Sequence, residues 1–140
     1  MFWKQIAVGE YERALVAKNG RFHAILTPGR HRVFTWPGVY VEVEKFDTRD
    51  LVFRSLWANY LVRRRPEVVE RHFTVVRTTD VQVAMVYAEG QIVAVLTPGK
   101  RTLFWRGVAR ITADIVNVLS ELDSGWEDLT DGLEDLLARS

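Results

Sequence analysis

The sequence contains the four-residue run Leu-Thr-Pro-Gly twice, at residues 26–29 and again at residues 96–99. The residues around the run recur at the same offset of seventy positions: Ala14, Val16, Gly20, Ala24 and Phe34 return as Ala84, Val86, Gly90, Ala94 and Phe104. Self-similarity at a fixed period means that one supersecondary unit is used twice. The sequence therefore predicts a tandem duplication in which residues 26–29 and 96–99 form equivalent turns.

The chain has 140 residues, of which 48% are hydrophobic and 26% are charged, proportions that are ordinary for a folded protein. The charge is unevenly distributed. Residues 121–140 contain seven acidic residues and one basic residue, a net charge of −6, whereas residues 1–120 carry 18 basic and 11 acidic residues, a net charge of +7. An asymmetry of this size between segments is typical of an interaction tail.

The absence of cysteine excludes disulfides and thiolate zinc sites and fits a reducing compartment. Residues 1–8 lack the apolar core of a signal peptide, and no run reaches the roughly 20 apolar residues that span a bilayer. The expected location is therefore the cytoplasm.

Each repeat predicts a four-stranded β-meander. In the first repeat, Asn19-Gly20 suits a type I′ hairpin turn and Pro28-Gly29 suits a type II turn. The expected strands cover residues 11–18, 21–26, 31–34 and 39–44, the last with an alternating apolar pattern. The second repeat has Glu89-Gly90 at its hairpin, and its strands over residues 83–88 and 92–96 are apolar on both faces. Such strands are expected to be covered on both sides.

Two segments show helical spacing. Residues 47–72 predict a helical connector that begins at Asp47 or Thr48, carries Arg63, Arg64 and Arg65 at the end of its first helix, and starts a second helix at Pro66. Residues 120–140 predict an acidic amphipathic helix capped by Ser124. Its apolar stripe is the predicted protein-interaction site and consists of Trp126, Leu129, Leu133, Leu136 and Leu137.

The predicted fold class is mostly β with α (α+β): two tandem four-stranded β-meander repeats joined by a helical segment, with a C-terminal amphipathic helix. The predicted divisions are the first β repeat at residues 1–46, the helical connector at residues 47–72, the second β repeat at residues 73–119, and the acidic helix at residues 120–140.

Several local patterns resemble the N-terminal region of bacterial slipins, members of the stomatin, prohibitin and flotillin superfamily. They lie at residues 12–16 and 19–22, 26–31, 46–50 and 103–107, so the resemblance covers about residues 5–118. It implies a non-catalytic, β-rich assembly protein that is commonly oligomeric and peripheral to membranes. After Val118 the chain departs from the family: the acidic segment stands where a slipin continues into its main domain and coiled coil.

Chemistry-bearing residues form no recognisable site. His23, His31 and His72 lack metal-ligand spacing, and the four serines have no paired base in the pattern. The glycines belong to turns and not to a phosphate-binding loop. We therefore expect no catalytic residues, no metal, no cofactor and no enzymatic activity.

Basic residues offer a second possible surface, made of Arg63, Arg64, Arg65, Arg30, Lys100 and Arg101. Without a nucleic-acid-binding motif, these side chains are better explained as the solvated end of a helix and two turns. The preferred function is a homo-oligomeric scaffold whose C-terminal helix contacts protein. The alternative is a basic adaptor that binds nucleic acid or anionic lipid through residues 63–65.

Overall fold

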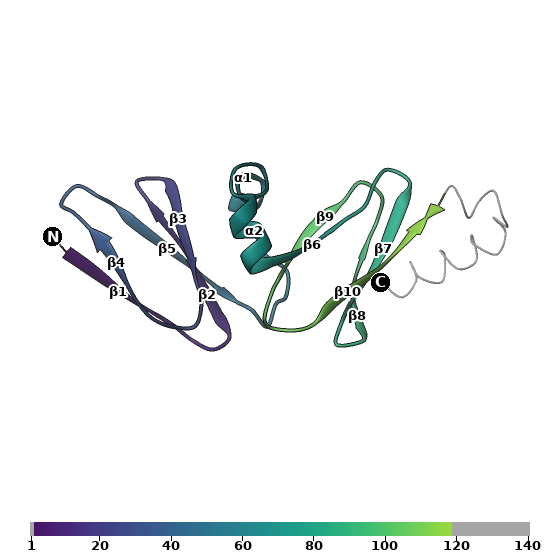
Figure 1. Ribbon diagram of the computed structural model, residues 1–140, viewed down its shortest axis with the longest axis horizontal. Helices are drawn as coiled ribbons and strands as arrows, with labels where there is room; N and C mark the ends of the chain where they lie inside the picture. Colours follow the sequence, from purple (N-terminus) through teal and green to yellow (C-terminus); the bar gives the residue numbers. More distant parts are fainter. Residues whose placement is uncertain (1, 119–140) are drawn as a thin grey trace. The chain divides into compact units, whose positions relative to one another are not determined.

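The computed structural model describes residues 2–118, which are mostly β with two short helices and divide into one compact unit up to His72 and another from Phe73 onward (Figure 1). Unit 1 contains β1 (Phe2–Val8), β2 (Glu12–Lys18), β3 (Arg21–Leu26), β4 (Gly29–Thr35), β5 (Val41–Asp47), α1 (Trp57–Arg64) and α2 (Pro66–His72). Unit 2 contains β6 (Phe73–Arg77), β7 (Gln82–Ala88), β8 (Gln91–Leu96), β9 (Arg101–Trp105) and β10 (Ile111–Asn117).

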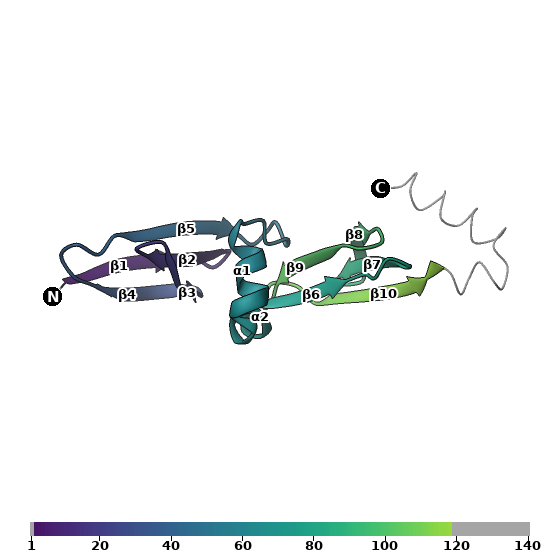
Figure 2. The ribbon, with the colours of Figure 1, turned by 90° about the horizontal axis from the view of Figure 1, so that it is seen from above.

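The strands of each unit do not pair as a meander, which corrects the expected topology. In unit 1, β2 is the central strand of a three-stranded antiparallel sheet with β3 and β5 on either side, and β4 pairs with β1 instead of β3 (Figure 2). Unit 2 repeats this plan with β7 between β8 and β10, and with β6 paired to β9. Each repeat therefore has five strands, because the segment before the predicted first strand is itself a strand.

Unit 1 is built in three layers. The ribbon of β1 and β4 packs on the inner face of the sheet, and the resulting core contains Ile6, Val8, Ala14, Val16 and Val33. The outer face of the same sheet is covered by the two helices, which bury Leu61 and Val69. The Phe22 ring of β3 lies 6.2 Å from the Trp57 ring of α1, so the helices contact the sheet through β3.

The duplication extends to individual hydrogen bonds. Asn19 and Glu89 adopt the positive φ that the hairpin turns were predicted to need. Their side chains accept 2.8 and 2.7 Å hydrogen bonds from the backbone N–H groups of Tyr40 and Arg110, which precede the last strand of each unit. The β2–β3 and β7–β8 pairs share the same register and carry a bulge at the same place, after Val16 and after Val86 respectively. The two three-stranded sheets therefore have the same strand pairing and register, as a tandem duplication predicts.

The Pro-Gly turns are not equivalent, contrary to the prediction. Gly99 lies in a turn with φ of 73°, as a type II turn requires, whereas Gly29 has φ of 136° and already belongs to β4. Thr78 holds the second turn in place, because its buried hydroxyl donates to Thr97 O at 2.7 Å and accepts from Lys100 N at 2.9 Å. Val8 occupies the corresponding position in unit 1 and has no hydroxyl.

The connector is helical over a shorter range than predicted. Residues 48–56 form turns and irregular backbone, and α1 begins only at Trp57. The Asp47 and Asp50 carboxylates accept hydrogen bonds from the backbone N–H groups two residues ahead, a local pattern that competes with helix formation. A further hydrogen bond from the Arg49 side chain lowers the pKa of Asp47 to about 2. The second helix begins at Pro66, as predicted.

The predicted C-terminal helix, with its stripe of Trp126, Leu129, Leu133, Leu136 and Leu137, lies outside the described residues. Within residues 2–118, neither helix has the length or the apolar character that crossing a membrane requires.

Candidate interaction surfaces

Three aromatic rings form a partly exposed row at the end of the β1–β4 ribbon. The Trp3 and Phe34 ring centroids are 5.2 Å apart, those of Phe34 and Trp36 are 5.3 Å apart, and both contacts are edge-to-face. Trp3 and Trp36 are each 55% exposed. We call these three residues the aromatic surface. Edge-to-face packing fixes the ring orientations, so the surface is preformed.

The equivalent positions in unit 2 do not form an exposed aromatic row. Phe73 and Phe104, the counterparts of Trp3 and Phe34, are 1% and 0% exposed. Arg106 replaces Trp36, and its guanidinium donates to the Phe73 carbonyl at 3.1 Å. The β6–β9 register is also displaced by one residue relative to β1–β4, so Trp105 lies opposite Phe73 and packs on it with the ring centroids 4.7 Å apart. The exposed aromatic surface is therefore a property of unit 1.

A groove of about 240 Å³ separates β3 from α2 in unit 1. Phe22 and Ile25 provide apolar walls, and Arg65 lies over the Phe22 ring with its guanidinium carbon 5.2 Å from the ring centroid. Arg65 also donates to the Glu67 carboxylate at 2.5 Å, and this hydrogen bond is the main cause that lowers the pKa of Glu67. The remaining polar side chains of the lining are those of His23, Arg71 and His72.

The two histidines of the groove have lowered pKa values. Burial is the larger cause for both; the charge of Lys18 adds to it at His23, and the charges of Arg71 and Arg13 add to it at His72. The neutral imidazoles are thus favoured in the folded chain. Protonation of His72 would place a positive charge near the guanidinium groups of Arg71 and Arg13.

Acidification is expected to destabilise unit 1 through these histidines. Because the pKa of His72 is lower in the folded chain than in the unfolded one, the unfolded chain binds more protons as pH falls below about 6.5. Thermal unfolding followed from pH 8 to pH 5, roughly the range over which histidines titrate, should show Tm falling in its acidic half. The fall should be smaller in His72→Gln; equal slopes in the two chains would contradict this assignment.

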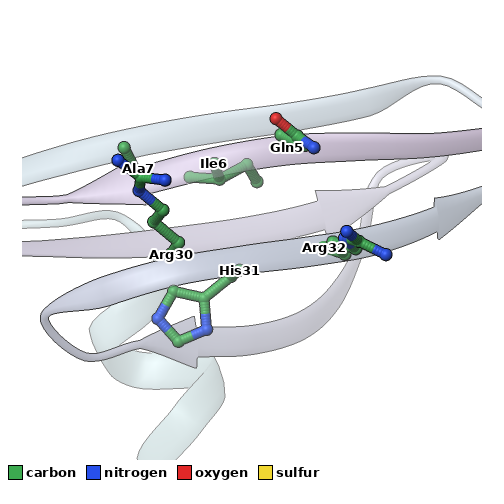
Figure 3. A pocket seen from close by; sticks show the side chains of 6 residues that line it. All are labelled: Gln5, Ile6, Ala7, Arg30, His31 and Arg32. Carbon is green, nitrogen blue, oxygen red and sulfur yellow. The ribbon is translucent and has the colours of Figure 1, made fainter.

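A second pocket, of about 400 Å³, runs along the β1–β4 ribbon (Figure 3). Three cross-strand pairs line it: Gln5 with Arg32, Ile6 with His31, and Ala7 with Arg30. Alternation along β4 places Arg30 and Arg32 on the side opposite His31 (Figure 3). The His31 Nε2 atom is hydrogen-bonded to the Thr27 carbonyl at 2.7 Å.

The predicted basic residues lie on several different elements of the two units. Arg63 and Arg64 are exposed at the end of α1, whereas Arg65 lies in the groove beside β3. Arg30 lines the separate pocket on the β1–β4 ribbon. Lys100 and Arg101 belong to unit 2, in the turn before β9 and at the start of that strand.

The sequence alone did not predict the aromatic surface. The missing information was the pairing of β1 with β4, which brings Trp3 opposite Phe34. The only local sequence signal for the aromatic surface was the spacing of Phe34 and Trp36, which places both rings on one face of an extended segment. Among the described residues, no group of three or more histidine, aspartate or glutamate side chains is arranged to hold a metal ion.

Comparisons of the chain with family models, with curated proteins and with solved structures gave no match.

Proposed function

We propose that this chain is a non-enzymatic, self-assembling scaffold protein related to the N-terminal region of slipins. Copies contact one another through the aromatic surface of unit 1, and the acidic C-terminal segment makes a second protein contact. The exposure of Trp3 and Trp36, each 55%, is the observation that carries the proposal.

The duplication favours a second copy as the occupant of this surface. Terminal units of repeat proteins normally present a polar outer surface, which keeps them soluble. Unit 1 presents tryptophan rings instead, and the counterpart of Trp3 in unit 2, Phe73, is buried. The same five-strand plan thus buries the aromatic side chain at this position in unit 2 (Phe73) and exposes it in unit 1 (Trp3).

Tryptophan is among the residues that contribute most to protein interfaces, where a single ring can account for 2 kcal/mol or more, an order-of-magnitude value. The two tryptophans flank Phe34 in a fixed geometry, so little side-chain entropy is lost when a partner covers them. A contact of this kind depends on apolar burial and should persist at high salt.

Replacing both Trp3 and Trp36 with serine is expected to weaken self-association by at least roughly tenfold, because the two main anchors are removed. Light scattering coupled to size-exclusion chromatography, from micromolar to near-millimolar protein, measures the effect. Leu56→Ser is the matched control, since Leu56 is fully exposed at 100% and lies outside the aromatic surface. A wild-type chain that stays monomeric throughout this range would overturn the proposal.

The alternative is a basic adaptor that uses Arg63 and Arg64, both exposed at the end of α1, to bind nucleic acid or anionic lipid. Phosphate contacts would make that binding fall steeply with salt. Binding of duplex DNA, single-stranded RNA or phosphatidylserine vesicles that disappears at high salt and in Arg63→Ser/Arg64→Ser would favour the adaptor.

A further inference from the structure

The outer face of the central sheet is covered in unit 1. Its apolar side chains come from β2 and β3, and each of them is at most 8% exposed: Leu15, Ala17, Phe22 and Ile25. The cross-strand pairs of Leu15 with Ile25 and of Ala17 with Phe22 place them on the same face. Helices α1 and α2 supply the cover, with Trp57 and Arg65 on the Phe22 ring.

The same face is only partly covered in unit 2. The counterparts pair across β7 and β8 in the same register and are also apolar: Met85, Tyr87, Ile92 and Val95. None of them is fully buried, and Ile92, which replaces Phe22, is 52% exposed. The neighbouring Val93 is 46% exposed. An apolar sheet face of this composition normally packs against another layer.

The segments that follow the last strand of each unit can be compared along the sequence. In unit 1 the covering segment follows β5, and Trp57 comes ten residues after Asp47. In unit 2 the segment that follows β10 is residues 118–140, and Trp126 comes nine residues after Asn117. The residue after the last strand makes an equivalent hydrogen bond in both units. Thr48 N donates to Tyr11 O in unit 1, and Val118 N donates to Val81 O in unit 2.

The apolar spacing of the two segments also agrees. Trp57 is followed three residues later by Tyr60, and their rings are in edge-to-face contact 5.6 Å apart. Trp126 is followed three residues later by Leu129, and the stripe continues through Leu133 and Leu137. Leucine side chains are stabilised when they pass from water to a packed face, so such a stripe is a strong driving force for docking.

We propose that residues 119–140 fold back over the outer face of unit 2 in the same chain, with the apolar stripe on Ile92 and its neighbours. This inference deepens the proposed function, because it gives the acidic segment a place on the scaffold and leaves its carboxylates outward for a second copy. A −6 segment held in this way presents charge opposite to that of residues 1–120.

Introduced cysteines test the inference directly, because the chain of 140 residues contains no cysteine. Ile92→Cys combined with Leu129→Cys is expected to form an intramolecular disulfide at least roughly tenfold faster than the matched pair Arg77→Cys with Leu129→Cys. Arg77 is exposed on β6, in the other sheet of unit 2. Oxidation at low micromolar concentration is followed by intact mass and by non-reducing gel electrophoresis. Adding Trp126→Ser and Leu133→Ser should reduce the rate of the first pair to that of the control.

Equal rates for the two cysteine pairs would overturn the inference. Disulfides formed only between chains would overturn it as well, since they would show that the segment covers a neighbouring copy. Light scattering of the same samples separates this result from the proposed function. A rapid intramolecular disulfide in a chain that never associates would support docking of residues 119–140 and reject the scaffold function. Association of the chain with equal disulfide rates for the two cysteine pairs would support the scaffold function and reject docking.

Discussion

Replacing Phe22 with alanine is expected to destabilise unit 1 by about 3–5 kcal/mol, the usual cost of removing a buried aromatic ring. Phe22 is 8% exposed, and its ring packs on Trp57 of α1 and lies beneath the guanidinium of Arg65, which follows that helix. Without the ring, α1 and α2 lose their main contact with β3. Urea denaturation followed by circular dichroism measures the loss of stability.

Hydrogen exchange identifies where that loss occurs. In Phe22→Ala, protection should fall over β2, β3, α1 and α2 while β7 and β8 keep theirs, since the substitution lies in unit 1. Tyr40→Ala is the matched control, because Tyr40 is 67% exposed and its loss should change stability by no more than about 0.5 kcal/mol. Equal destabilisation by the two variants would contradict the role given to Phe22.

Replacing Trp105 with alanine is expected to destabilise unit 2 to a similar extent, about 3–5 kcal/mol. Trp105 is 1% exposed and packs on Phe73, the residue opposite it in the β6–β9 ladder. Removing the indole leaves a large cavity beside Phe73, and surrounding structure relaxes only partially into such a cavity. Protection of β6 and β9 against hydrogen exchange should fall first.

Trp36→Ala provides the comparison for Trp105, because it removes the same side chain from a position that is 55% exposed. Below the concentration at which the chain self-associates, this variant should change the unfolding free energy by no more than about 1 kcal/mol. A loss as large as that of Trp105→Ala would mean that Trp36 is a structural residue of unit 1 and would weaken its assignment to the aromatic surface.

Local chemistry explains which parts of the fold could be predicted. Asn19 and Glu89 precede glycine, and both take the positive φ that a tight hairpin needs. Alternating apolar residues identified the strands that pair in those hairpins. Pro66 begins α2 because a missing N–H is tolerated in the first helical turn.

Other features depend on partners far away in the chain. Residues 48–56 fit a helical pattern, but the Asp47 and Asp50 carboxylates satisfy nearby backbone N–H groups and hold turns there. The aromatic surface required β4 to pair with β1, more than twenty positions away in the sequence. The period of two in a strand predicts which side chains share a face, but it does not predict which other strand pairs with it.

The sequence by itself determined that one unit was used twice, that its hairpins turn at Asn19-Gly20 and Glu89-Gly90, and that the fold is mostly β. Only the tertiary structure decided which strands pair, which Pro-Gly sequence forms a turn and which aromatic rings are buried. The physical reason is the range of the interactions involved. A turn or a period is fixed by neighbouring residues, whereas Thr78 holds the turn at Gly99 through contacts about twenty residues distant, and Val8 offers no such contact in unit 1.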